Sequence, residues 1–343
     1  MRVLQAMAGA EHGGAETFYE RLVVGLHNAG VTQKVIIRKD QGRASRLRTG
    51  GVDPVELNFG GMLDFQTSRQ LKKIVGEFNP DIVLTWMNRA TKMMPAGAGY
   101  KLIARQGGYY DLKYYRHCDY IVGNTQGIVE YLKEEGWPEN RVQYLPNFVS
   151  IEKAQPVSKA ELSTPEGAPL LLSLGRLHRN KAFDVLIDAL PSLEGVYVWI
   201  AGEGPERAAL ETQARAKGVE DRVCFLGWRQ DVSALLASCD VYVCPSRHEP
   251  LGNVVIEGWA AGKPVVAAAS QGPTELIRSG ENGLLSPVDD SEALAQGISK
   301  VLADHELSEL LVMAGRSEYE TYFTEKAVVE KYLDFFNRIL DQS

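Results

Sequence analysis

Two glutamates, eight positions apart, frame the segment of the sequence that is best suited to chemistry. Glu249 lies in a predicted loop, and Glu257 lies in a helix that the pattern predicts from Asn253 to Ala261. The backbone N–H groups that would open this helix belong to Gly252, Asn253 and Val254. A helix start presents unpaired N–H groups and partial positive charge, so it can bind a phosphate. Because a carboxylate on each side can accept hydrogen bonds from hydroxyls, the whole segment suits a nucleotide-sugar.

The segment from Glu249 to Glu257 resembles the E-x7-E signature of retaining glycosyltransferases of the GT-B fold, especially family 4. Further blocks resemble the same family: Gly13–Glu16, Leu174–Leu177, Asn180–Asp184, Ile200–Pro205, Phe225–Trp228 and Asn282–Leu285. The resemblance covers nearly the whole chain, and it is strong from Leu170 to Val288 and weaker before Pro146. It implies an α/β protein of the GT-B fold, with two Rossmann-like doubly wound domains facing a central cleft.

The alternation of strand and helix patterns also predicts parallel sheets with helices on both faces, in two series. The first series begins at Val3, the second begins at Leu170, and the intervening segment 151–168 is interpreted as a linker. In the family, a final helix such as Glu325–Leu340 crosses back to the first domain. We therefore expect an N-terminal acceptor-binding domain, residues 1–150 with 325–343, and a C-terminal nucleotide-sugar-binding domain, residues 151–324.

Arg176 and Lys181, which follow Gly175 in one of the matching blocks, are the predicted cations for the diphosphate of the donor. Negative charge grows on a departing nucleoside diphosphate, and cations already in place lower that barrier. The resemblance implies that Glu257 binds the ribose hydroxyls. It also implies that Glu249 lies beside the donor sugar, on its 3- or 4-hydroxyl, without acting as the nucleophile.

No Asp-x-Asp metal motif follows a strand, and the pair Asp289-Asp290 is interpreted as a helix cap before Ala293. We therefore expect no metal and no cofactor, with the nucleotide-sugar acting as a co-substrate. The nucleobase is predicted to lie near Trp228 and Arg229, although Trp228 could equally be a core residue. Uracil and guanine are not distinguished, and the sugar could be UDP- or GDP-linked.

The first domain contains both a match to the family and a departure from it. Gly13 and Gly14 follow the first strand, where small residues allow close approach of a diphosphate. Many relatives carry a His after the strand Lys101–Ala104, and Arg105 and Gln106 stand near that place. An amide such as Gln106 can still bind a sugar hydroxyl. Candidates on the acceptor side are His12, Arg105 and Tyr109, with Asp111 and His117 as weaker ones.

Charge is divided unevenly between the two halves of the chain. Residues 1–150 contain 19 Lys and Arg against 15 Asp and Glu, and the remainder contains 18 against 29. Five basic residues cluster in a predicted loop: Arg38, Lys39, Arg43, Arg46 and Arg48. Such a loop can bind anionic head groups. We therefore hypothesise an anionic acceptor, such as a glycolipid of lipopolysaccharide core synthesis, and contact with the inner membrane; a solvated polar loop is the alternative.

Composition is consistent with a two-domain cytoplasmic enzyme of 343 residues. No apolar run is long enough to span a bilayer, and the start does not resemble a signal peptide. The four cysteines show no paired spacing and are interpreted as reduced thiols. The acidic balance argues against nucleic acid as a partner. Alternative functions are a non-catalytic nucleotide-sugar-binding protein, which the missing His would fit, and a nucleotide-sugar epimerase of similar build.

Overall fold

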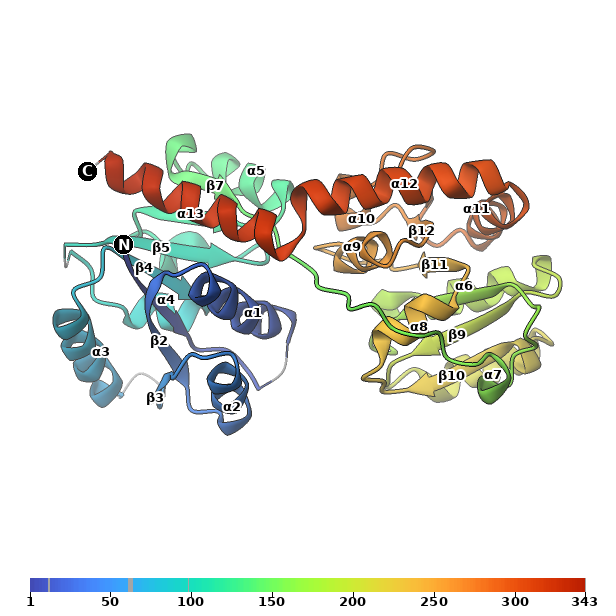
Figure 1. Ribbon diagram of the computed structural model, residues 1–343, viewed down its shortest axis with the longest axis horizontal. Coiled ribbons are helices and arrows are strands. Elements are labelled where there is room, and N and C mark those ends of the chain that lie inside the picture. The colour runs from blue at the N-terminus through green and yellow to red at the C-terminus, as the bar shows by residue number, and fades with distance from the viewer. Residues whose placement is uncertain (12, 61–63, 98, 343) are drawn as a thin grey trace. The chain divides into compact units, whose positions relative to one another are not determined.

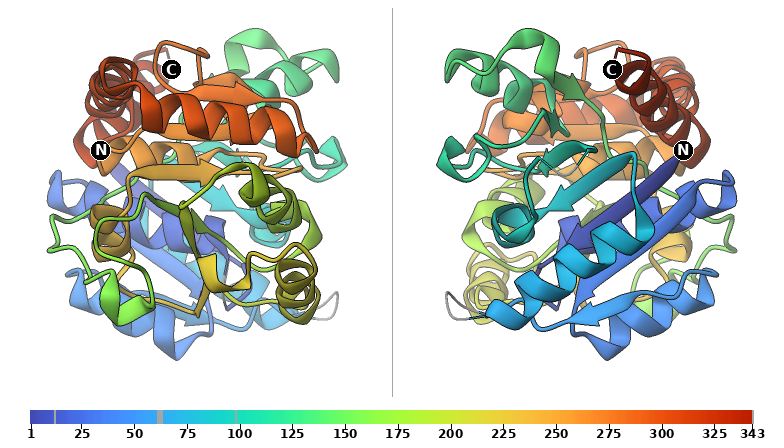
Figure 2. Two further views of the ribbon diagram at one scale, coloured as in Figure 1. Left: turned by 90° about the vertical axis from the view of Figure 1, so that its right-hand side faces the viewer. Right: turned by 90° about the vertical axis from the view of Figure 1, so that its left-hand side faces the viewer.

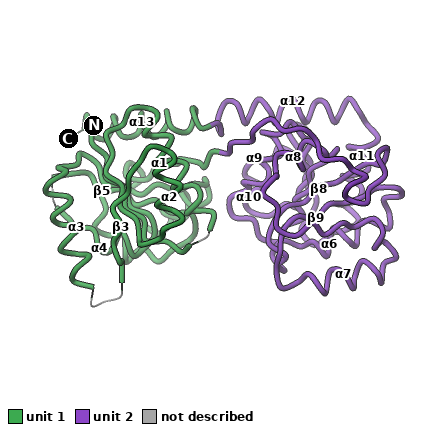
Figure 3. Tube along the Cα trace, turned by 60° about the horizontal axis from the view of Figure 1, so that its bottom comes forward, with its two compact units in different colours: residues 1–148, 325–343 green, residues 149–324 purple. Residues whose placement is uncertain are grey.

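The computed structural model describes residues 1–11, 13–60, 64–97 and 99–342. The chain divides into two compact units, of which the first contains residues 1–148 and 325–343 and the second residues 149–324 (Figure 3). The expected boundary at residue 150 therefore lies two residues from the observed one.

Unit 1 contains a parallel sheet with the strand order β3-β2-β1-β4-β5-β6-β7 in its described residues. The strands are β1 (Arg2–Met7), β2 (Thr32–Arg38), β3 (Val55–Leu57), β4 (Ile82–Trp86), β5 (Lys101–Gln106), β6 (Tyr120–Gly123) and β7 (Val142–Tyr144). The α-helices are α1 (Gly14–Asn28), α2 (Gln41–Thr49), α3 (Phe65–Phe78), α4 (Met87–Met93), α5 (Gln126–Glu134) and α13 (Glu325–Asp341).

Alternating residues of these strands point to two separate apolar cores, as the period of two in a strand requires. In β1, Val3 and Met7 pack against the core beneath α1 and α13, whereas Leu4 and Ala6 pack against the core beneath α3 and α5. Helices consequently cover both faces of the sheet (Figure 2). The predicted apolar side of the last helix is confirmed, since all four of its expected residues are buried: Val328, Tyr332, Phe335 and Ile339.

Unit 2 contains a second parallel sheet, with the strand order β10-β9-β8-β11-β12-β13 in its described residues (Figure 1). The strands are β8 (Leu170–Leu174), β9 (Tyr197–Ala201), β10 (Val223–Gly227), β11 (Val241–Cys244), β12 (Val265–Ala268) and β13 (Leu284–Ser286). The α-helices are α6 (Phe183–Ala189), α7 (Arg207–Ala216), α8 (Val232–Ser238), α9 (Asn253–Ala260), α10 (Gln271–Leu276), α11 (Ser291–Ala303) and α12 (His305–Tyr322).

The cysteines are free thiols, as the sequence predicts. Burial raises the pKa of Cys118 and Cys239 to about 12 and that of Cys244 to about 11. A raised pKa keeps these thiols protonated, and the thiolate is the reactive form. The three side chains therefore act as small apolar groups in the cores of units 1 and 2 and not as nucleophiles.

Candidate functional site

The strand order of unit 2 places a topological switch point between β8 and β11. The chain proceeds from β8 outward to β9 and β10, and from β11 outward in the opposite direction to β12 and β13. In open α/β sheets, ligands bind beyond the carboxyl ends of the strands at such a point. The loop after β8 and the loop after β11 meet there, since the N–H of His248 donates to the carbonyl oxygen of Asn180 at 3.2 Å.

Lys181 and Glu249 are brought together by these two loops. Lys181 lies in the short 3-10 turn Arg179–Lys181, and its Nζ donates to Oε2 of Glu249 at 2.5 Å. The exposed fraction of the side chain is 25% for Lys181 and 9% for Glu249, so the pair is largely shielded from water. The sequence predicts both residues as site residues, but it gives no sign of this direct ion pair across 68 positions.

Helix α9 begins where the sequence predicts, and it ends one residue earlier, at Ala260. Gly252 precedes the helix with φ 68°, a left-handed conformation that suits glycine. The neighbouring Gly272 N–H donates to the carbonyl oxygen of Glu249 at 2.7 Å. An added Cβ on Gly272 would lie 2.3 Å from the nitrogen of Gly252, so this close approach of backbones requires glycine. The predicted phosphate-binding helix start is therefore held firmly in place.

Glu257 lies in α9 and is half-buried beside Tyr242, whose hydroxyl donates to Oε2 of Glu257 at 3.4 Å. Burial raises the pKa of Tyr242 well above its ordinary value, and the charge of Glu257 adds to this effect. Tyr242 therefore stays protonated and keeps one carboxylate oxygen of Glu257 in position, while Glu257 remains a candidate for the ribose hydroxyls.

Arg176 is exposed, and it makes no ion pair with any described residue. Arg176 directly follows Gly175, and the backbone of Gly175 lies very close to Gly202. A Cβ added to Gly202 would be only 1.9 Å from the carbonyl oxygen of Gly175. Gly202 has φ 144°, so both conformation and space exclude a side chain there. This packing of the loop after β9 against the loop after β8 positions the backbone from which Arg176 extends.

Arg247 is a site residue that the sequence analysis does not single out. Its guanidinium donates to both carboxylate oxygens of Asp184, at 2.8 and 2.6 Å, and it forms a second ion pair with Asp289. Burial alone would raise the pKa of Asp184, but the hydrogen bonds and charge of Arg247 outweigh it and lower that pKa. Arg247 thus connects the Glu249 loop to α6.

The interpretation of Asp290 as a helix cap is confirmed, because its side chain accepts from the N–H of Ala293.

The expected nucleobase residues lie after β10. Trp228 is 75% exposed, so the alternative that it is a core residue is wrong. Arg229 is paired with Asp231 through two hydrogen bonds, at 2.8 and 2.5 Å. An exposed aromatic ring beside a neutralised arginine offers an apolar surface, and the assignment to a nucleobase stays a prediction.

In unit 1, the glycine loop after β1 is closed by Glu16, a buried residue in the first turn of α1. Its Oε1 accepts from the N–H of Ala10 at 2.8 Å. An added Cβ on Gly13 would lie 2.3 Å from Oε2 of Glu16, whereas one on Gly14 would meet nothing within 4 Å. A side chain at Gly13 would therefore have to displace the Glu16 carboxylate, and Gly14 leaves open space at the start of the helix. His12 lies outside the described residues.

The remaining candidates of unit 1 cluster at the end of β5. Arg105 and Gln106 are both buried, and as neighbours in the strand they lie on opposite faces of the sheet. Neither the nitrogen nor the oxygen of the Gln106 side-chain amide has a hydrogen-bond partner. Tyr109 is exposed and packs edge-on against Tyr131 at 5.2 Å between ring centroids. Two weaker candidates already have partners: Asp111 pairs with Lys113, and His117 contacts the carbonyl oxygen of Thr91.

The basic segment after β2 differs from its expected form, because residues 41–49 form helix α2 and not a loop. Asp40 caps this helix by accepting from the N–H of Arg43 at 2.9 Å. Three of the five basic residues are also paired with carboxylates: Arg43 with Glu20 and Asp40, Arg46 with Glu20, and Arg48 with Asp53 and Glu56.

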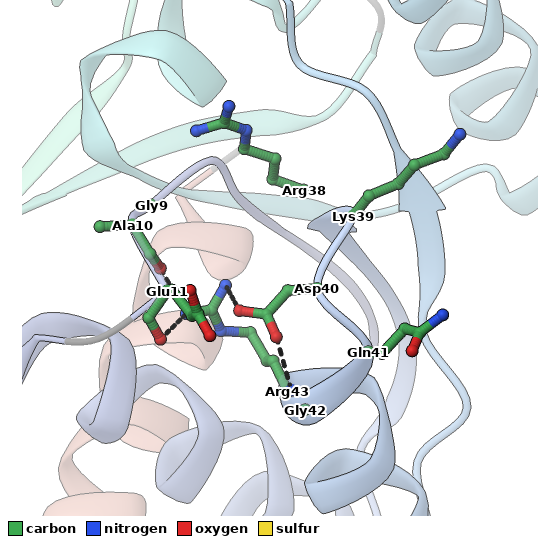
Figure 4. Close-up of a pocket in the computed structure, with 9 residues that line it drawn as sticks. All are labelled: Gly9, Ala10, Glu11, Arg38, Lys39, Asp40, Gln41, Gly42 and Arg43. Carbon is green, nitrogen blue, oxygen red and sulfur yellow. Dashed lines mark hydrogen bonds and ion pairs between the residues drawn. The ribbon is translucent and has the colours of Figure 1, made fainter.

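A cavity of about 430 Å³ lies beside α2, and three of the five basic residues line it: Arg38, Lys39 and Arg43. Of these three, Arg43 is paired with carboxylates, whereas Arg38 and Lys39 form no ion pair with a described residue. Figure 4 shows the Arg43 guanidinium bound by Asp40 and by the carbonyl oxygens of Ala10 and Glu11. The side chains of Arg38 and Lys39 extend away from Arg43 (Figure 4). The basic segment therefore has less unpaired charge for anionic head groups than the sequence suggests.

The described residues contain neither a cluster suited to a metal ion nor a helix suited to span a membrane. Within 1–11, 13–60, 64–97 and 99–342, no group of three or more His, Cys, Asp or Glu side chains is placed to hold a metal ion. None of the helices in those ranges has the length and apolar character needed to cross a bilayer.

Comparison with known proteins defines first the class of fold. The chain is similar to a crystal structure of Anabaena HepE in complex with UDP and glucose, with a TM-score of 0.81 and 21% sequence identity. The similarity covers 98% of this chain and 100% of that chain. It shows the GT-B fold, as the sequence resemblance implies.

Sequence comparison then defines the family. The chain is 37% identical to the lipopolysaccharide core biosynthesis glycosyltransferase LpsE of Rhizobium meliloti (strain 1021), over 94% of this chain and 95% of LpsE. It is 35% identical to LpsD of the same organism, over 98% of each chain. Residues 12–153 match the family described as Glycosyltransferase Family 4, and residues 154–318 match Glycosyl transferases group 1. The chain belongs to the family 4 glycosyltransferases.

Proposed function

We propose that this glycosyltransferase moves a hexose from a UDP- or GDP-linked sugar to a hydroxyl of a glycan or glycolipid, with retention of the anomeric configuration. The observation that supports it most strongly is the joint position of Lys181, Glu249 and the start of α9 at the switch point of unit 2. A cation, a carboxylate and the backbone N–H groups of a helix start there match the diphosphate and the hydroxyls of a nucleotide-sugar.

The donor would be bound by groups with separate roles. Backbone N–H groups of Gly252, Asn253 and Val254 and the side chain of Arg176 bind the diphosphate. Glu257 accepts hydrogen bonds from the ribose. Glu249 accepts from a hydroxyl of the sugar and holds Lys181 beside the bond that breaks. The open surface of Trp228 provides apolar contact for the base.

In the reaction, the bond from the anomeric carbon to the diphosphate oxygen breaks while the acceptor oxygen bonds to the same face of that carbon. The acceptor hydroxyl passes its proton to the departing diphosphate oxygen, so no protein base is needed. Lys181 and Arg176 stabilise the negative charge that accumulates on the diphosphate. These two side chains would replace a divalent ion, and we therefore propose a reaction without metal or other cofactor.

The acceptor would bind to unit 1, and the names of LpsE and LpsD support a place in lipopolysaccharide core or other cell-envelope glycan synthesis. We place the enzyme in the cytoplasm, where nucleotide-sugars are made, and its site of action at the cytoplasmic face of the inner membrane.

The test is a donor panel with the purified full chain, in which release of UDP or GDP is followed without acceptor and with lipopolysaccharide core glycans. One donor should be hydrolysed slowly alone and faster with an acceptor, and the product should keep the anomeric configuration of the donor by NMR. Chelation with EDTA should leave the rate unchanged. Intact donor binding with no turnover across the panel would favour the non-catalytic alternative, and an inverted product would exclude retention.

A further inference from the structure

Two arginines are buried in the described part of the chain, and their surroundings differ. Arg43, 1% exposed, is paired with the carboxylates of Glu20 and Asp40, both at 3.1 Å. Arg105, 5% exposed, has no carboxylate of a described residue within ion-pair distance. Taking a charge out of water is costly unless an opposite charge compensates it, so Arg105 is the exception that requires an explanation.

The partners of Arg105 are all neutral. Its Nε donates to the hydroxyl oxygen of Tyr332 at 3.2 Å, and its Nη2 donates to Oδ1 of Asn147. The guanidinium carbon lies 4.7 Å from the ring centroid of Phe18 and 4.5 Å from that of Trp86. Burial lowers the pKa of Arg105, an effect that Tyr332 opposes. Two aromatic faces and two polar groups support the cation without neutralising it, since arginine stays charged in proteins.

The part of Arg105 that remains available faces Gly107 and Asn124. Its Nη1 makes no hydrogen bond to any described residue. A Cβ added to Gly107 would lie 3.9 Å from this Nη1 and 3.5 Å from Nδ2 of Asn124. Asn124 is 6% exposed, and its buried Oδ1 has no partner. Buried polar atoms almost always have hydrogen-bond partners, so this cluster has unused capacity for a ligand.

The location of the cluster fits a ligand site. Arg105 is the second-to-last residue of strand β5, which ends at Gln106. Asn124 directly follows β6, which pairs with β5. Both residues are therefore at the carboxyl edge of the sheet, where ligands bind in this class of fold. Gly107 has no side chain to occupy the space beside Nη1 of Arg105 and the amide of Asn124.

We propose that Arg105 and Asn124 bind an anionic group, a carboxylate or a phosphate, carried by a sugar of the acceptor. This inference rests on the proposed function and adds the chemistry of the acceptor to it. Nη1 of Arg105 and Nδ2 of Asn124 donate to the anion, which supplies the missing opposite charge. Oδ1 of Asn124 accepts from a hydroxyl of the same sugar. The acceptor is therefore an acidic or phosphorylated sugar and not a neutral one.

The test replaces the missing anion with one from the protein. In Asn124→Asp, a side chain of the same shape places a carboxylate beside Arg105. The melting temperature should rise, because the buried cation gains a partner, while added anions should lose their site. Asn140→Asp is the matched control, since Asn140 is exposed in the same unit and gains the same charge. The melting temperature and the anion binding of Asn140→Asp should match those of the wild type.

Binding to the full chain is measured by calorimetry and thermal shift with three probes: glucuronate, glucose 6-phosphate and glucose. The wild type should bind at least one of the two acids about tenfold or more tightly than glucose. Preference for glucuronate identifies a carboxylate, and preference for glucose 6-phosphate identifies a phosphate. Asn124→Asp should lose this preference and be at least as stable as the wild type.

Gly107→Ala provides a second variant if Asn124→Asp does not fold. Its methyl group would make only ordinary contacts with the protein, but it would occupy the space that the anion needs. Equal binding of glucose and both acids by the wild type would overturn the proposal, as would undiminished acid binding in both variants. Donor hydrolysis by the wild type is a separate measurement. Its absence would count against the proposed function, whether or not the two acids bind.

Discussion

Replacing Lys181 with methionine should separate the catalytic effect of its charge from its effect on stability. If Lys181 stabilises the departing diphosphate, its loss should cost about 2–4 kcal/mol of transition-state stabilisation, as for one preorganised donor in an oxyanion hole. That corresponds to a decrease in kcat of roughly 30- to 900-fold. Binding of the free nucleoside diphosphate should weaken less, because the extra negative charge exists only after the bond begins to break.

The same change leaves Glu249 as a shielded carboxylate without its cation. Breaking a fully buried ion pair costs about 3–5 kcal/mol. Because a quarter of the Lys181 side chain is exposed and water screens the pair, we expect about 1–3 kcal/mol here. For a domain of this size, each kcal/mol lowers the melting temperature by about 2–4 °C.

The double variant Lys181→Met, Glu249→Gln removes both charges and should regain most of the lost stability without regaining turnover. The matched control is Lys217→Met, which breaks an exposed pair with Asp188 at 2.9 Å and should change neither quantity by much. Stopped assays of nucleotide release and thermal melts measure the two effects. Turnover of Lys181→Met within about twofold of the wild type, or recovery of turnover in the double variant, would refute the role of Lys181 as the diphosphate cation.

Three further predictions concern unit 2. Glu257→Ala should raise the KM for the donor more than it lowers kcat, because ribose binding is equally present before and during the reaction; equal losses in both would contradict this role. Gly202→Ala should destabilise unit 2 by about 1–3 kcal/mol in a denaturant melt, since its Cβ would overlap the carbonyl oxygen of Gly175. The lowered pKa of Asp184 stabilises the folded state at neutral pH, and this contribution is lost as the pH falls through that pKa. Arg247→Ala should therefore flatten the acid side of the stability profile, and an unchanged profile would refute the pairing.

The parts of the site that could be predicted from sequence are those that local signals determine. The start of α9 depends on Gly252 and the residues directly after it, and its predicted and observed ends differ by one position. The cap formed by Asp290 is also local, because its side chain accepts from the N–H of Ala293, three positions further on. Both features depend on contacts between residues that are close in the chain, where propensity and capping rules apply.

The features that sequence could not provide depend on contacts between distant residues. Helix α2 has no apolar period of its own, and it is stabilised by Asp40 and by Glu20, more than twenty positions away. A basic composition alone therefore predicts a loop. The pairing of Arg247 with Asp184 spans 63 positions and is equally invisible in a single sequence.

Under the proposed function, the ion pair between Lys181 and Glu249 would direct binding energy to the reaction itself. In the resting site Lys181 is already neutralised by Glu249, so a diphosphate that arrives there must share this cation. Its ground-state binding is then weaker than an unpaired lysine would give. In the proposed reaction, the diphosphate would gain a further negative charge as the glycosidic bond breaks and would compete better for Lys181, while Glu249 would face the positive charge that develops on the sugar. Both interactions would strengthen in the transition state more than in the ground state, and only such differential binding raises kcat. The backbone contacts between Gly272 and Glu249 and between His248 and Asn180 keep the two loops in place throughout, so this arrangement exists before the donor binds.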